Sequence, residues 1–241
     1  MQKINTSPKK YARLGGLLYL INIIFGIFAI AYVEGKIMVA DDPAATANNI
    51  ITHEFLYRLG IAAHIIILLT NIPIALIFYR LFRIVNKNAT VLVLFFSLVG
   101  TAIEAVNLLN QYEPLLLLYN KVSINSLSQG DVQKWVFTLL RLKTVGFNLA
   151  LVFFGCYGFS IGYLIIKSQF LPKAIGVFMA IGGGCYLFYS FATFLVPKFA
   201  ASLVPFIQIP SGLAEISFAL WLFIAGVNFT RWKEQEQIAL S

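Results

Sequence analysis

The sequence predicts an all-α fold, a polytopic membrane helix bundle of about six transmembrane helices with both termini in the cytoplasm. Composition is the first observation behind this prediction: 12% of the 241 residues are charged and 59% are hydrophobic, and mean hydropathy is +0.82. Soluble domains carry roughly 25% charged residues. The chain therefore lacks the polar surface that a soluble domain needs, and we expect the bilayer to be its solvent.

The second observation is a series of apolar stretches, each long enough to cross the hydrocarbon core, which takes ~20 residues in a helix. Together they form one transmembrane domain over residues 1–241. The predicted spans are residues 14–33, 58–82, 89–112, 143–166, 174–196 and 211–230.

The third observation is the position of the basic residues. The net charge is +8, but the Lys and Arg residues form small clusters between apolar stretches, so we expect no nucleic-acid partner. Most of the 18 basic residues fall on one side of the predicted topology, which places both termini in the cytoplasm by the positive-inside rule. The clusters on that side are Lys3, Lys9, Lys10 and Arg13; Arg80, Arg83 and Lys87; Lys167 and Lys173; Arg231 and Lys233.

The first span has a rival interpretation as a cleavable signal peptide. Basic residues precede an apolar stretch, and Ala29-Ile30-Ala31 resembles a cleavage site. The stretch is long for a signal peptide, so we expect it to stay in the protein as a span.

Two loops on the outer side carry helix-start signals. Asp42-Pro43 combines a capping side chain with a residue that suits the first helical turn. It predicts a short helix over 43–55. Ser128 and Asp131 suit a capping box, which predicts a helix that begins at the outer surface and continues into the fourth span.

Polar side chains inside the spans follow the helical period. In the third span, Ser97, Thr101 and Glu104 share one face, with Asn107 at its edge. Glu104 lies ~22 Å along this helix at 1.5 Å per residue, against a core of ~30 Å. Such residues are costly in lipid and usually face protein or water.

The other spans repeat this pattern in their outer halves. We therefore predict a polar chamber that opens outward and binds a ligand. Its candidate ligand-binding residues are His64, Asn71, Glu104, Asn107, Arg141, Asn148 and Glu215.

Five short motifs, in order, resemble a known family. They are Arg13–Tyr19, Asp42–Ala47, Phe55–Gly60, Phe170–Val177 and Glu215–Leu222. The ordered set is similar to a family of bacterial integral membrane proteins termed domain of unknown function 4386, over roughly residues 11–230. The resemblance implies a multi-pass protein of the bacterial cytoplasmic membrane. It implies no activity, so catalytic residues stay unassigned.

Three functions remain open. The first is binding or transport of a small amphipathic or lipid-like molecule in the chamber, for which aromatic lining is suitable. The second is a scaffold or accessory subunit that recognises a membrane-protein partner. The third is an intramembrane lipid-modifying enzyme with His64 and Glu104 as an acid–base pair.

A purely structural role competes with all three functions. In it, Glu104 or Glu215 pairs with Arg141, and the amides bond between helices. His64, Glu104 and Glu215 have side chains of the types that bind zinc. The sequence has no HExxH motif to support such a site, so we expect no metal. No motif implies a cofactor. The expected partners are membrane lipids, an amphipathic ligand and another membrane protein.

Overall fold

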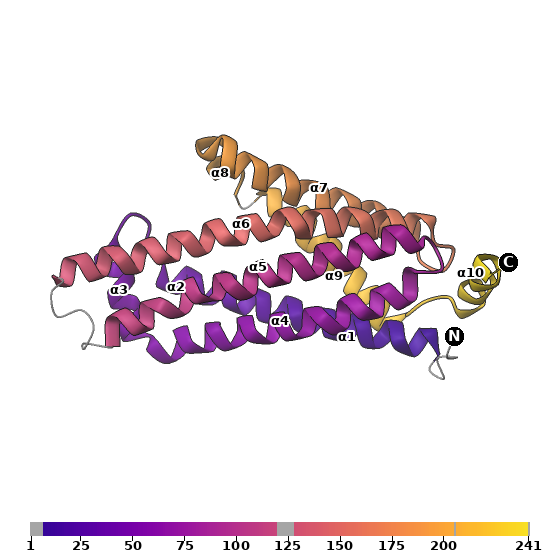
Figure 1. Cartoon of the computed structure of the whole chain (residues 1–241), viewed down its shortest axis with the longest axis horizontal. Helices are drawn as coiled ribbons and strands as arrows, with labels where there is room; N and C mark the ends of the chain where they lie inside the picture. Colours follow the sequence, from indigo (N-terminus) through magenta and orange to yellow (C-terminus); the bar gives the residue numbers. More distant parts are fainter. Residues whose placement is uncertain (1–6, 120–127, 205, 241) are drawn as a thin grey trace. The chain divides into compact units, whose positions relative to one another are not determined.

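The computed structural model describes residues 7–119, 128–204 and 206–240. Throughout these ranges the chain forms helices and no strands (Figure 1), which confirms the all-α prediction. Lys3 lies outside the described residues. In chain order the elements are α1 (Pro8–Gly26), the π-helix η1 (Ile27–Glu34), α2 (Gly35–Ile37), α3 (Pro43–Thr52), α4 (Glu54–Phe82), α5 (Lys87–Tyr119), α6 (Gln129–Lys167), α7 (Lys173–Leu195), α8 (Pro197–Leu203), η3 (Phe206–Gln208), α9 (Ile209–Ile224) and α10 (Phe229–Leu240).

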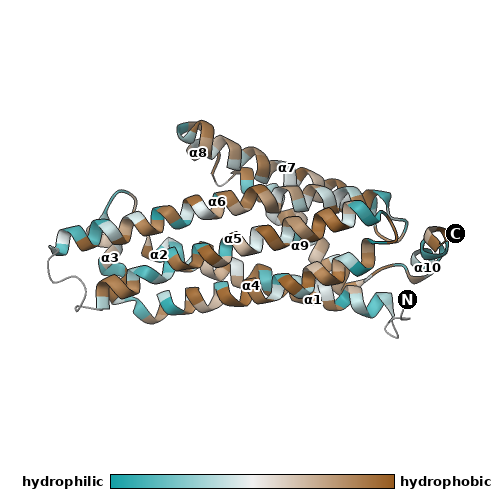
Figure 2. Cartoon of the chain, in the orientation of Figure 1, coloured by the Kyte–Doolittle hydropathy of each residue, from teal (hydrophilic) through white to brown (hydrophobic). Residues whose placement is uncertain are grey.

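Six helical segments in the described residues are long and apolar enough to cross a membrane. In Figure 2 their ribbons are mostly brown, and α10 and the start of α1 are mostly teal. Large apolar side chains on these segments are exposed, Phe55 to 75%, which suits contact with lipid. A multi-pass membrane protein is therefore confirmed. The segments are Pro8–Ile37, Glu54–Phe82, Lys87–Tyr119, Gln129–Lys167, Lys173–Leu195 and Phe206–Ile224.

The sixth span ends earlier than predicted. The helix ends at Ile224, whereas the prediction extended it to residue 230. Gly226 adopts φ +71°, a left-handed conformation that favours glycine and ends helices. A separate helix, α10, then begins at Phe229.

Both predicted helix starts are confirmed. Asp42 Oδ1 accepts a hydrogen bond from the Ala45 N–H at 2.9 Å, and α3 begins at Pro43 and ends at Thr52. The Asp131 N–H donates to Ser128 Oγ at 3.2 Å. The helix α6 begins at Gln129 and continues into the fourth span, as predicted.

The chain divides into two compact units, each built from segments that are distant in sequence. Unit 1 contains Met1–Ile21, Thr70–Thr101 and Leu149–Ser241, and unit 2 contains Asn22–Leu69 and Ala102–Asn148. The expectation of a single transmembrane domain stays a prediction, as does the orientation of the termini.

Unit 1 is packed through glycines and aromatic rings. A Cβ atom at Gly162 of α6 would lie 2.6 Å from the Gly176 carbonyl oxygen of α7, so these two helices approach closely because both residues are glycine. On another side, the Tyr19 and Phe78 rings lie 6.1 Å apart edge to face, and Phe218 lies 5.3 Å from Phe78. These rings form an apolar cluster within unit 1.

Unit 2 has its own apolar core, to which the short helix α3 contributes. The Val39 N–H donates to Thr46 Oγ1 at 3.0 Å, which holds α3 against the end of the first span. The polar site described below lies beside this core. The buried members of the core are Val33, Ile37, Ala47, Ile50, Tyr57, Ile61, Leu115, Val136 and Leu140.

Candidate functional site

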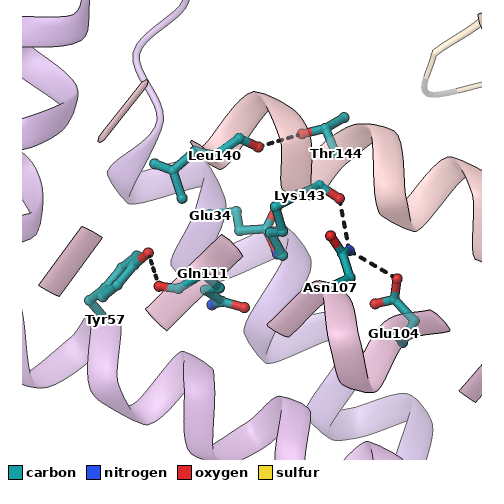
Figure 3. A network of polar contacts seen from close by, with 8 residues as sticks. All are labelled: Glu34, Tyr57, Glu104, Asn107, Gln111, Leu140, Lys143 and Thr144. Atoms are coloured by element: carbon teal, nitrogen blue, oxygen red, sulfur yellow. Dashed lines mark hydrogen bonds and ion pairs between the residues drawn. The ribbon is translucent and has the colours of Figure 1, made fainter. Parts of the chain in front are cut away.

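The centre of the site is an ion pair inside unit 2. Lys143 of α6 pairs with Glu34 at the end of η1 (Figure 3). The Lys143 side chain is 7% exposed and that of Glu34 is 30% exposed. Charged groups at such depth in a membrane protein are costly unless they are paired. This pair is therefore the strongest candidate for a functional group in the described chain.

A π-helix positions Glu34. The helix η1, Ile27–Glu34, widens the end of the first span, and π-helical turns occur frequently at functional sites. Val33, the residue before Glu34, packs against Gly60 of α4: a Cβ atom at Gly60 would lie 2.9 Å from Val33 Cγ1. The glycine at position 60 therefore allows η1 to lie close against α4.

The amide of Asn107 joins α5 to α6 at the site. Asn107 Nδ2 donates to the Lys143 carbonyl at 2.9 Å and to Glu104 Oε1 at 3.1 Å, as the dashed lines in Figure 3 show. A Cβ atom at Gly146 would collide with the Asn107 amide. Glycine at this position of α6 therefore makes room for the hydrogen bond.

Tyr57, Gln111 and His64 complete the network. Tyr57 Oη donates to the Gln111 carbonyl at 2.6 Å. The Gln111 side chain and Lys143 are neighbours of the buried His64 imidazole. Gln111 Oε1 and His64 Nδ1 have no hydrogen-bond partner within the described protein. Buried polar atoms usually have a partner, and exceptions point to strain, chemistry or a bound group.

A small cavity opens at the ion pair. Its volume is about 20 Å³, enough for one water-sized group. The cavity lining is mixed, with apolar side chains from the first span and α6 beside the two charges. The lining residues are Val33, Glu34, Ile37, Met38, Tyr57, Gln111, Leu140, Lys143 and Thr144.

Two of the predicted site residues on α6 have other local partners. Arg141 is exposed, lies 3.1 Å from Asp41 and stacks over the Phe137 ring. It therefore pairs with Asp41, whereas the structural alternative paired it with Glu104 or Glu215. Asn148 is buried, and its Nδ2 donates to the Thr144 carbonyl at 2.9 Å.

The predicted residues Asn71 and Glu215 belong to unit 1. Asn71 Nδ2 donates to Thr101 Oγ1 at 3.1 Å. Glu215 is half-buried beside Tyr186. The other five predicted residues, namely His64, Glu104, Asn107, Arg141 and Asn148, belong to unit 2.

The sequence interpretation missed the ion pair itself. It predicted the helix start at Ser128, but it treated Lys143 only as the first residue of the fourth span and did not assign it to the buried face of the long helix. Val136, Leu140 and Lys143 are all buried, at i, i+4 and i+7 of one helix face. A helix that starts at the Ser128 cap extends this apolar face through Lys143, and that pattern is the signal that could have found it.

The site offers charges and hydrogen bonds for binding a polar group. Glu34 and Glu104 supply carboxylate acceptors, and Lys143 supplies an ammonium donor. Among residues 7–119, 128–204 and 206–240, no group of three or more His, Cys, Asp or Glu side chains could hold a metal ion.

Comparison with known proteins adds a family match. The family model described as "Domain of unknown function (DUF4386)" matches residues 14–226. The chain is also similar to an "Uncharacterized protein" of Archaeoglobus fulgidus, with 24% identity over 161 residues that cover 67% of this chain and 80% of the relative. No solved structure matches.

Proposed function

This chain belongs to the DUF4386 family, and we propose that it binds a small amphipathic molecule at the Glu34–Lys143 pair. Binding is the step that a carrier and a receptor share, and transport would follow from it. The observation that carries the proposal is a buried ion pair that borders a cavity.

Stability alone is a weak explanation for this pair. Replacing a buried ion pair with well-packed apolar residues is often neutral or stabilising. If the pair served only to fix the fold, we would expect every polar atom around it to have a hydrogen-bond partner. Here Gln111 Oε1 and His64 Nδ1 have no partner within the described protein. Gln111 also lines the cavity, so its side chain can contact a group bound there.

The size and lining of the cavity define the class of ligand. A volume of about 20 Å³ admits a polar group of very few heavy atoms, such as a hydroxyl or an amine. Apolar Val33, Ile37 and Leu140 adjoin the charges, so the ligand is polar at one end and apolar next to it. The rest of such a molecule extends outside the cavity.

An acid–base reaction of His64 with Glu104 has less support. Gln111 and Lys143 are neighbours of His64, and Glu104 accepts a hydrogen bond from the Asn107 amide. A catalytic pair needs hydrogen-bond reach between the acid or base and the reacting group. Binding is therefore the function that the observed contacts favour.

The proposal includes an orientation and a location. Basic residues in the first half of α1, around the connection from α4 to α5, at the end of α6, at the start of α7 and in α10 favour cytoplasmic termini by the positive-inside rule. In this orientation α3 faces outward, and the membrane is the cytoplasmic membrane of a bacterium. Fusing a cytoplasm-active reporter to the C-terminus tests the orientation: an active fusion supports it and an inactive, fully inserted one contradicts it.

Native mass spectrometry tests the binding proposal. We would compare the full-length wild type with Glu104→Gln, which keeps the shape of the side chain and removes its charge beside the Asn107 amide. Glu113→Gln is the matched control, because Glu113 lies on the same helix and is exposed. We expect a bound molecule in the wild type and the control, and a reduced bound fraction in Glu104→Gln. A wild type without a bound molecule would contradict the proposal.

A further inference from the structure

A second cavity lies in unit 1, where α6 ends and α7 begins. Its volume is about 400 Å³, within the size range of small-ligand sites. Lys167 at the end of α6, Lys173 at the start of α7 and Arg231 of α10 all line it. These residues come from three separate elements, and the fold brings their charges to one cavity.

The charge of this cavity is uniformly positive. Its described lining contains three basic side chains and no carboxylate. The ion pairs found in the described part of the chain join Arg58 to Glu54, Arg141 to Asp41 and Lys143 to Glu34, so none neutralises the cavity. An anion is the ligand that this field attracts.

The helix geometry adds to the positive field. The helix α7 is 23 residues long, and no side chain caps its N-terminus at Pro172. Its first N–H groups and its dipole therefore favour an anion beside Lys173. Ser168 and Gln169 supply polar lining, and Leu171 supplies an apolar wall.

Hydrogen bonds join the loop after α6 to α10 and to the residue before it, and α10 is itself anchored to α4. The Asn228 N–H donates to the Phe170 carbonyl at 3.1 Å, and the Gln169 N–H donates to Gln235 Oε1 at 3.2 Å. Trp232 Nε1 donates to the Leu81 carbonyl at 3.2 Å. A site that is already formed loses less entropy when a ligand binds.

We propose that this cavity binds the phosphate group of an anionic ligand. Arg231 offers a planar fork that matches phosphate, and the two lysines add point charges. The cavity lies at the ends of two spans, which places it where phospholipid headgroups lie. An anionic phospholipid and a soluble phosphate share this chemistry. The inference is independent of the Glu34–Lys143 site.

The test uses full-length protein in detergent, titrated with phosphatidylglycerol and followed by native mass spectrometry. The pocket variant is Lys167→Gln/Lys173→Gln/Arg231→Gln. The control variant removes the same charge from exposed lysines that do not line the cavity: Lys10→Gln/Lys87→Gln/Lys233→Gln.

We expect the pocket variant to bind phosphatidylglycerol about 100-fold more weakly than the wild type, from the contribution of each basic residue near an anionic lipid surface. The control variant should bind within a few-fold of the wild type. Equal binding by wild type and pocket variant, or equal weakening in both variants, would overturn the proposal. If the triple variant does not fold, the single variants Arg231→Gln and Lys173→Gln replace it. Each should weaken phosphatidylglycerol binding about fivefold.

Two further arms identify the source of the phosphate. Phosphatidylcholine, which has no net charge, should bind the wild type and the pocket variant equally. Inorganic phosphate at millimolar concentration is added to the phosphatidylglycerol complex. If phosphate displaces the lipid from the wild type and has no such effect on the pocket variant, the site is open to soluble phosphate. If the lipid stays bound to the wild type, the site is one for phospholipid. If the pocket variant lost phosphatidylcholine binding more than phosphatidylglycerol binding, the site would not select its ligand by charge.

Discussion

Glu34 and Lys143 stand 109 positions apart in the sequence and form a buried ion pair within unit 2. Each charge is stable at this depth because the other is present. The surrounding hydrogen bonds then fix where the lysine can lie, since Asn107 holds the Lys143 backbone carbonyl.

Removing one member of the pair should destabilise the protein more than removing both. Glu34→Gln removes the ion-pair partner of the buried Lys143 and should cost about 3 kcal/mol of the free energy of unfolding. Lys143→Met should cost less, because Glu34 is more exposed. The double variant Glu34→Gln/Lys143→Met should lie close to the wild type. Thermal unfolding in detergent measures this, and a double variant less stable than Glu34→Gln would contradict it.

Gly146→Ala should disrupt the site without touching a charge. The added Cβ would collide with the Asn107 amide, which must move and release the Lys143 carbonyl. Overpacking of this kind costs about 1–3 kcal/mol. Gly26→Ala is the control, because a Cβ there would meet nothing within 4 Å, and we expect unchanged or slightly higher stability. Equal melting temperatures for the two variants would show that Asn107 is not held as described.

Trp232→Ala should free α10 from the rest of unit 1. Trp232 is buried, and its indole donates to the Leu81 carbonyl. Removing the buried ring and its hydrogen bond lowers the free energy that is needed to open α10 locally. Hydrogen exchange should become faster over 229–240, while α7 keeps its protection. Leu240→Ala, which removes an exposed side chain from the same helix, should leave the exchange unchanged; similar exchange in both variants would argue against the anchor.

The spans were predictable because each depends on local composition. About 20 apolar residues make a span in any context, and the caps at Asp42 and Ser128 act on backbone groups three residues away. The end of the sixth span was missed because Gly226 stops the helix inside a stretch that stays apolar. The π-helical form of η1 has no signal in the local sequence pattern, and its close contact, Val33 with Gly60, joins residues that are distant in the sequence.

The candidate site was predictable in part. Burial of His64, Asn107 and Asn148 follows from the cost of exposing polar groups to lipid. The partner of Arg141 was not predictable from its helix, because Asp41 lies 100 positions away. Lys143 was missed because a lysine near the end of an apolar stretch usually marks the membrane surface, and a long helix placed this one on the buried face instead.

The measurement that tests the central claim most directly is native mass spectrometry of three full-length proteins. These are the wild type, Glu34→Gln/Lys143→Met, and Asp41→Asn/Arg141→Gln, which neutralises an exposed ion pair of the same unit. We predict that a discrete small molecule stays bound to the wild type and to the surface variant, and is lost from the variant of the buried pair. The same bound molecule at the same occupancy in all three proteins would contradict the assignment of the ligand site to Glu34 and Lys143.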